Sequence, residues 1–258
     1  MSDQPRPAPV AYLDDIFLAS DEARPLRILS EYLDPLQAFR REHIRNTIVF
    51  FGSARLSETG PLGRFYRDAR ELSRLLTQWS QTLTPKSHHY VICSGGGGGI
   101  MEAANRGAAD AGGRSIGLNI SLPHEQRPNP YVTPELTFEF HYFFMRKLWF
   151  AHLASALVVF PGGFGTLDEL TEILTLAQTR KLDRRIPILL YGPDYWHEVL
   201  NFDALLKHGM IDAKDLALLE FVDAPSAAFE RLQQLLGAPE AGEAPAFAHS
   251  RTRKSPRT

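Results

Sequence analysis

Short apolar runs alternate with longer amphipathic stretches along the chain, and this order predicts an α/β fold. The expected strands are residues 47–51, 90–93, 115–120, 136–140, 156–160, 186–190 and 219–222. The expected helices are residues 62–79, about 100–108, 142–153, 166–177, 195–206 and 225–236. We therefore expect a doubly wound, largely parallel sheet of about seven strands, with helices on both faces and ligands at the carboxyl ends of the strands.

The two ends of the chain differ in composition from this alternating region. Residues 1–10 are rich in proline and polar side chains, which predicts a mobile tail, and residues 12–43 predict two short helices packed as an appendage. Residues 237–258 are rich in Ala, Pro and Glu before a basic end, which predicts a disordered tail. We thus expect an N-terminal part (1–45), a main domain (46–236) and a tail (237–258).

The stretch from residue 156 to residue 170 is the most informative one. It combines a buried strand, a tight turn and a helix start, which together form an anion site because unpaired N–H groups point outward with the helix dipole behind them. We expect Thr166 to cap this helix and Glu169 to complete a capping box. The candidate phosphate ligands of the turn are Gly162, Gly163, Gly165 and Thr166. The alternative is an ordinary turn that uses glycine only for tight packing.

Two further glycine turns follow the first and second predicted strands. Gly52 and Ser53 end the first strand, and five glycines, residues 95–99, follow the second. A glycine run between a buried strand and an alanine-rich helix indicates a loop against which a ligand lies closely. The spacing does not fit the dinucleotide fingerprint, and no Gly-Lys pair exists to form a P-loop. The candidate phosphate and ribose ligands here are Gly52, Ser53, Gly97, Gly98 and Gly99.

The predicted helix at residues 142–153 is apolar on nearly every side except at Arg146 and Lys147. Two adjacent cations in such a helix are costly unless an anion meets them, so both are candidate substrate ligands. The alternative is that their long side chains reach solvent. A helix this apolar must also be covered on more than one face, and a second subunit of a homodimer or higher homo-oligomer would supply that cover.

Composition and charge exclude several classes of protein. The 258 residues are 44% hydrophobic with a net charge of −2, enough for a substantial core but without the basic surface of a nucleic-acid binder. The single Cys93 excludes an internal disulfide and fits a reducing compartment. No signal-like or membrane-spanning apolar stretch occurs, so we expect a cytoplasmic protein. His88 and His89 are adjacent and have no acidic or cysteine partner nearby, so no metal site is expected.

Residues 161–169 read Pro-Gly-Gly-Phe-Gly-Thr-Leu-Asp-Glu, and with the Arg146-Lys147 pair and the glycine run they resemble the Lonely-guy (LOG) family, long mislabelled as lysine decarboxylases. The resemblance covers about residues 47–236. It implies a Rossmann-like homo-oligomer that needs no cofactor and hydrolyses the N-glycosidic bond of nucleoside 5′-monophosphates, of the AMP or cytokinin riboside type, to free base and ribose 5-phosphate. The catalytic arginine and glutamate of that family fall on Arg146 and Glu169.

The expected chemistry follows from these two side chains. Glu169 would stabilise an oxocarbenium-like ribose and activate the attacking water, while Arg146 would hold phosphate or ribose and fix Glu169. Plant-type members carry Met-His-x before the Arg-Lys pair, whereas this chain carries Phe143-Phe144-Met145, which leaves the base preference open.

Two other functions fit the same residues. The first is a nucleotide-binding regulatory module without turnover. The second is a lysine decarboxylase, which would need a lysine Schiff base with a pyridoxal cofactor. Only Lys147 lies near the predicted site, and the neighbouring Arg146 leaves it no evident room.

Overall fold

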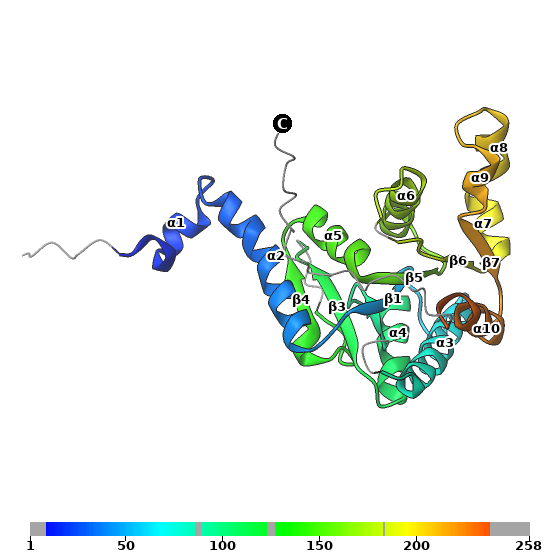
Figure 1. The fold of residues 1–258 in the computed structure, drawn as a ribbon, viewed down its shortest axis with the longest axis horizontal. Helices are drawn as coiled ribbons and strands as arrows, with labels where there is room; N and C mark the ends of the chain where they lie inside the picture. The colour runs from blue at the N-terminus through cyan, green and yellow to red at the C-terminus, as the bar shows by residue number, and fades with distance from the viewer. Residues whose placement is uncertain (1–8, 86–88, 123–126, 183, 238–258) are drawn as a thin grey trace, which may run out of the picture.

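The computed structural model of the protein describes residues 9–85, 89–122, 127–182 and 184–237. Within them, seven strands form one sheet in which every neighbouring pair is parallel, in the order β4-β3-β2-β1-β5-β6-β7 (Figure 1). The strands are β1 (Asn46–Phe51), β2 (Tyr90–Ser94), β3 (Ser115–Ile120), β4 (Thr137–Phe140), β5 (Ala154–Val159), β6 (Ile188–Tyr191) and β7 (Leu219–Val222). The predicted doubly wound α/β fold is confirmed.

The strand order reverses between β1 and β5, which lie side by side in the middle of the sheet. Phe51 of β1 pairs with Val159 of β5, so the turns that follow these two strands leave the sheet together. The backbone N–H of Ser53 donates to the carbonyl of Pro161 at 3.0 Å and joins the two turns. This reversal point is where doubly wound sheets bind ligands.

Helices cover both faces of the sheet (Figure 1). Side chains of β1 alternate between two cores, with Val49 and Phe51 in one and Ile48 and Phe50 in the other. The first core is completed by α2, α5, α6 and α7, and the second by α3, α4 and α10. The helices are η1 (Ala11–Leu13), α1 (Asp15–Ala19), α2 (Arg24–Arg41), α3 (Gly63–Thr82), α4 (Ile100–Asp110), η3 (Pro134–Leu136), α5 (Phe143–Leu153), α6 (Phe164–Gln178), α7 (Pro193–Val199), α8 (Phe202–Lys207), α9 (Ala213–Leu216) and α10 (Pro225–Leu236).

Two helical predictions need correction. The second N-terminal helix, α2, is not short but 18 residues long, because its Phe39 reaches the core and packs against Trp149 of α5. The single helix expected at residues 195–206 is two helices, since the Asn201 side chain accepts from the N–H of Ala204 and starts α8 anew. The tails predicted at residues 1–10 and 237–258 lie outside the described residues except at residues 9, 10 and 237, and His88 also lies outside them.

No helix among the described residues has the length and apolarity that a bilayer crossing demands.

The long N-terminal helix also holds the start of α5 in place. Glu31 of α2 accepts hydrogen bonds from the backbone N–H groups of His141 (2.7 Å) and Tyr142 (3.2 Å), just before α5 begins. In return, the indole N–H of Trp149 donates to the backbone carbonyl of Glu31 at 3.1 Å. A residue far away in sequence therefore fixes the helix that carries Arg146.

We expect Glu31→Ala to lower the free energy of unfolding by about 1 to 2 kcal/mol, because two backbone donors lose a charged acceptor. Urea unfolding followed by circular dichroism measures the change. The matched control is Glu135→Ala, an exposed carboxylate in η3, which we expect to stay within about 0.5 kcal/mol of the wild type. Equal stability of the Glu31 variant and the wild type would contradict the role of this contact.

Candidate active site

Arg146 points from α5 back into the molecule. Its Nε donates to the carbonyl of Leu118 in β3 at 2.7 Å, and its Nη1 donates to Oε1 of Glu169 at 3.0 Å. The guanidinium also lies over the ring of Phe150, 5.1 Å from the centroid. Because the Arg146 side chain is only 10% exposed, the alternative that it extends into solvent does not hold.

Glu169, on α6, is the carboxylate that meets this guanidinium. Its side chain is 12% exposed. Burial raises the pKa of Glu169 to about 7, although the positive charge of Arg146 acts in the opposite direction. A carboxyl group with a pKa near neutrality can take up and release a proton at working pH, which suits it for acid and base chemistry.

The three predicted glycine turns lie next to one another around this pair. The N–H of Ile100, at the end of the glycine run, donates to the carbonyl of Ser53 at 3.0 Å. A Cβ on Gly95 would meet the guanidinium of Arg146 and the sulfur of Met101, so both side chains would have to move to make room for it. The structure thus brings the β1 turn, the β2 turn and the β5 turn to one place, together with Arg146 and Glu169.

The turn after β5 differs from its prediction in one respect. Helix α6 begins at Phe164 with Gly163 in the capping position, so Thr166 is not the N-cap and the expected capping box is not formed. Thr166 is instead buried, with its side chain against Gly162. The local reason is that the Gly-Phe-Gly sequence can already turn into the helix two residues before Thr166. Gly163 and Gly165 have open space where a side chain would stand, so their backbone is accessible to a ligand.

Lys147 is separated from the other candidates. Its Nζ contacts Asp168 at 2.7 Å and Glu172 at 3.3 Å on the outer side of α6. These contacts belong to a surface groove of ≈ 340 Å³ between α5 and α6. In this arrangement the ammonium group neutralises carboxylates beside Glu169, and its place among the predicted substrate ligands stays a prediction.

Sequence reasoning missed several residues that shape the site. The hydroxyl of Tyr195, on α7, donates to the carbonyl of Gly162 at 2.7 Å and fixes the β5 turn from outside. Asn129 holds the glycine run after β2 through its side-chain amide. Neither contact leaves a local signal, because both partners are distant in sequence. Cys93 is buried in the core, and its burial raises the pKa of the thiol.

A larger cavity, ≈ 550 Å³, lies at the other end of the sheet between α7, α8 and β7. None of the predicted site residues lines it. It therefore has no part in the chemistry derived from the glycine turns.

Solved structures with the same fold include a structural-genomics target, TM1055, with a TM-score of 0.51 at 21% identity, covering 73% of this chain and 99% of that one. A molybdenum cofactor binding protein from the phototrophic bacterium Rippkaea orientalis has a TM-score of 0.51 at 18% identity, covering 74% and 98%. At these identities the likeness shows the fold alone.

A protein-family model described as "possible lysine decarboxylase" matches residues 101–232, about half of the 258 residues, and this segment contains both Arg146 and Glu169. The chain belongs to this family. Membership of the LOG family, which the motif predicted, is thereby confirmed.

Two curated relatives in this LOG family are plant proteins. The chain is 36% identical over 83 residues to cytokinin riboside 5′-monophosphate phosphoribohydrolase LOG1 of Arabidopsis thaliana, which covers 32% of this chain and 38% of that protein. It is 29% identical over 132 residues to LOG3 of the same plant, covering 50% and 58%. The matches thus span about two fifths and three fifths of the two relatives.

The environment of Lys147 does not fit a lysine decarboxylase, the activity after which this family was first named. A lysine that forms a Schiff base needs a lowered pKa so that its amine is free to attack. Burial by itself would lower the pKa of Lys147, but the hydrogen bond to Asp168 and the charge of Glu172 outweigh it and raise the pKa. Lys147 is therefore a protonated, paired side chain.

Because the ion pair between Arg146 and Glu169 is buried, we expect the free energy of unfolding to depend on pH. The pKa of Glu169 in the folded state lies above its usual 4.5, so its ionisation weakens the fold as pH rises from 4.5 through about 7. Arg146→Met removes the compensating charge, and we expect it to cost about 3 to 5 kcal/mol at pH 8. At pH 5 the cost should be smaller because Glu169 then binds a proton. Chemical unfolding at both pH values measures the two differences.

Arg231→Met is the matched control for this prediction. Arg231 also makes a two-pronged ion pair, with Glu220, but both side chains are 38% exposed. Its loss should cost less than about 1 kcal/mol, with little difference between pH 5 and pH 8. A cost for Arg146→Met that does not grow with pH would contradict the assignment of a buried, titrating Glu169.

Proposed function

We propose that the protein is a nucleoside 5′-monophosphate phosphoribohydrolase, with residues 46–236 as its catalytic domain. The observation that carries this proposal is the buried Arg146–Glu169 pair beside three glycine turns at the reversal point of the sheet. A carboxyl group with a pKa of about 7 next to backbone anion sites suits a substrate that joins a phosphate to a reacting sugar. The names of the LOG relatives, which describe phosphoribohydrolases, support the same reaction.

The reaction breaks the bond between C1′ of the ribose and the nitrogen of the base. As the base leaves with the bonding electrons, positive charge develops on the sugar, and the ionised Glu169 stabilises it. Glu169 then accepts a proton from the attacking water, whose oxygen bonds to C1′. That proton passes through solvent to the nitrogen of the departed base, which restores the ionised carboxylate. The products are free base and ribose 5-phosphate.

The phosphate end of the substrate would be bound by backbone groups. The first N–H groups of an α-helix have no acceptor inside the helix, and those of α6 follow the open Gly163. The N–H groups of Gly97 to Gly99 and of Gly52, together with the hydroxyl of Ser53, would complete the phosphate site. Arg146 would hold the ribose or phosphate and keep the carboxylate of Glu169 oriented.

The alternative of a nucleotide-binding module without turnover uses the same phosphate site and needs no proton transfer. A buried carboxylate is unnecessary for binding alone, and it weakens binding of an anion when ionised. The Glu169 environment therefore favours the enzyme.

We expect Glu169→Gln to lower the rate of base release from AMP by at least about a thousandfold while nucleotide affinity changes less than about tenfold. The amide keeps the shape of the side chain but loses the charge that favours the cationic transition state. Chromatographic detection of free base measures the rate, and calorimetric titration with AMP measures affinity.

Asp168→Asn provides the control, because Asp168 is the neighbouring carboxylate but is exposed and bound to Lys147. We expect it to retain activity within a few-fold of the wild type. Rapid turnover by the Glu169 variant would remove Glu169 from the mechanism. Nucleotide binding by the wild type without any release of base, across a panel of nucleoside 5′-monophosphates, would favour the binding module.

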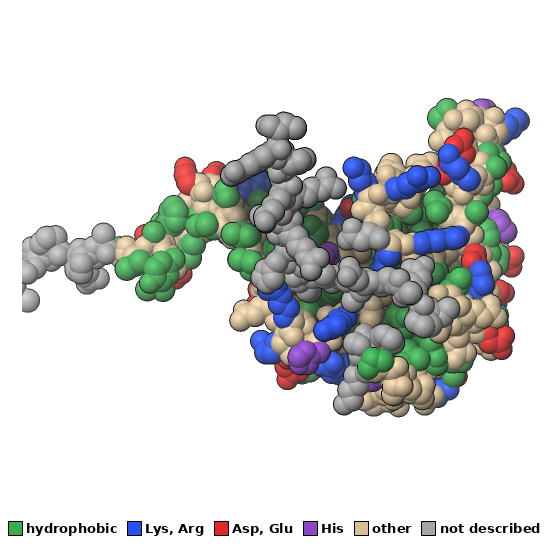
Figure 2. Space-filling view, in the orientation of Figure 1, with side chains coloured by type: hydrophobic (Ala, Val, Ile, Leu, Met, Phe, Trp, Pro, Cys, Tyr) green, Lys and Arg blue, Asp and Glu red, His purple; other side chains and the backbone are tan. Residues whose placement is uncertain are grey.

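We further propose that the protein acts as a homo-oligomer, at least a dimer. Phe143, Phe144 and Leu148 of α5 remain 53%, 51% and 40% exposed, beside the buried face that carries Trp149. The neighbouring α2 adds half-exposed leucines, and Figure 2 shows further hydrophobic side chains along the projecting N-terminal arm. Burying the exposed half of such a side chain is worth about 1 kcal/mol, so a second copy covering α5 is favoured, close to Arg146.

We expect light scattering at micromolar concentration to give a mass of at least twice the 28.9 kDa of one chain. Phe144→Glu should shift the protein toward that single-chain mass because it places a charge on the covered face. Val199→Glu, at an exposed position on α7, is the matched control and should leave the assembly intact. A fully active wild type with the mass of one chain would refute this proposal.

A further inference from the structure

A buried polar network lies directly behind the glycine run that follows β2. The side-chain Nδ2 of Asn129 lies 3.0 Å from the carbonyl oxygen of Gly96, 2.9 Å from that of Gly97 and 2.9 Å from Oδ1 of Asn105. The backbone N–H of Asn129 donates to the same Gly96 carbonyl at 2.8 Å. Ser94 closes the network, since its hydroxyl donates to Asn105 and accepts from the N–H of Gly96.

The orientation of the Asn129 amide follows from its contacts. Its Oδ1 accepts from the backbone N–H of Tyr131 at 3.1 Å, so the atom on the opposite side of the amide must be the NH2 group. That group faces three oxygens and no donor. Asn129 is 7% exposed, so water does not compete for these positions.

The directions of the carbonyls of Gly96 and Gly97 also determine the directions in which the N–H groups of Gly97 and Gly98 point. In a trans peptide the carbonyl of one residue and the N–H of the next point to opposite sides. With the carbonyls of Gly96 and Gly97 both held by Asn129, the N–H groups of Gly97 and Gly98 must point away from it. Among the described residues neither N–H has a protein acceptor.

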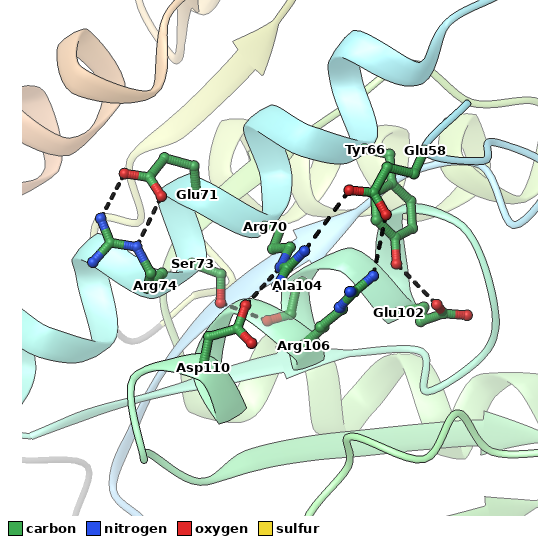
Figure 3. Close-up of polar contacts among 10 residues, drawn as sticks. All are labelled: Glu58, Tyr66, Arg70, Glu71, Ser73, Arg74, Glu102, Ala104, Arg106 and Asp110. Carbon is green, nitrogen blue, oxygen red and sulfur yellow. Dashed lines mark hydrogen bonds and ion pairs between the residues drawn. The ribbon is translucent and has the colours of Figure 1, made fainter. Parts of the chain in front are cut away.

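The other end of the glycine run is fixed by packing of α4 on α3 (Figure 3). The hydroxyl of Ser73 donates to the carbonyl of Ala104, Arg70 pairs with Asp110, and the hydroxyl of Tyr66 donates to Glu102 at 2.8 Å. These contacts hold α4 against α3, while Asn129 holds the loop that leads into α4.

We propose that Asn129 is a positioning residue of the phosphate site, which turns the N–H groups of Gly97 and Gly98 toward the bound anion. This inference rests on the proposed function, because it takes the glycine run to be a phosphate cradle. Asn129 itself does not touch the substrate. It acts by holding two backbone carbonyls on the far side, so that two donors are aimed before the ligand arrives.

The test is Asn129→Asp, which keeps the shape of the side chain but replaces the donor by an oxygen facing three other oxygens. We expect the dissociation constant of ribose 5-phosphate, measured by calorimetric titration, to rise about tenfold or more. For base release from AMP we expect KM to rise in parallel while kcat stays within about threefold, because Arg146 and Glu169 are unchanged.

Thr133→Val is the matched control. The Thr133 hydroxyl accepts from the N–H of Ser115 at 3.0 Å, so this variant loosens the same segment without touching the glycine run. We expect its affinity for ribose 5-phosphate to stay within about twofold of the wild type. Equal affinities of Asn129→Asp and wild type would overturn the positioning role while leaving the proposed function standing. A wild type that binds neither ribose 5-phosphate nor AMP would instead overturn both.

A measurement on the wild type covers the case in which Asn129→Asp does not fold. With ¹⁵N-glycine labelling, addition of ribose 5-phosphate should move the N–H signals of Gly97 and Gly98 downfield, and that of Gly209, on a distant turn between α8 and α9, should stay in place. Signals of Gly163 or Gly165 that move while those of Gly97 and Gly98 do not would show an anion bound at α6 alone, which overturns the inference.

Discussion

The buried ion pair between Arg146 and Glu169 sets the conditions for the rest of the site. Removing two charges from water costs several kcal/mol per ion, and the pair is stable only when its remaining hydrogen-bonding groups are also satisfied. The carbonyl of Leu118 and the ring of Phe150 meet that demand for the guanidinium. Strand β3, helix α5 and helix α6 must therefore keep their relative positions for the pair to exist.

The same pair explains features that look unrelated in the sequence. The guanidinium of Arg146 and the side chain of Met101 occupy the space that a Cβ on Gly95 would need. The start of α5 is held by Glu31 from a separate helix, since a shift of α5 would withdraw Arg146 from its three contacts. The cost that remains appears in the raised pKa of Glu169, which is the property that the proposed reaction uses.

Sequence reasoning succeeded where a single local cause decides the structure. The strand at 115–120 and the helix at 225–236 have the predicted bounds. A strand buried on both faces is a continuous apolar run, and a helix buried on one face repeats apolar residues every three or four positions, so both can be recognised in the sequence. It failed at Thr166, where glycine flexibility lets α6 begin earlier than the best capping residue. It also missed Asn129 and Glu31, whose partners are brought near only by the finished fold and which follow no periodic pattern.

Arg146 and Lys147 are adjacent in sequence but pair with different carboxylates, Arg146 with the buried Glu169 and Lys147 with Asp168 and Glu172 nearer the surface. Neighbours on a helix point about 100° apart, so one cation enters the core and the other stays near the surface of α6. There Lys147 neutralises Asp168 and Glu172, which leaves two cations against three carboxylates once Glu169 ionises. These side chains alone do not attract a phosphate dianion. In the proposed reaction, attraction for the phosphate would come from aligned backbone dipoles, namely the N-terminus of α6 and the N–H groups of the glycine run. The direction in which those peptides point would then decide whether the proposed substrate binds.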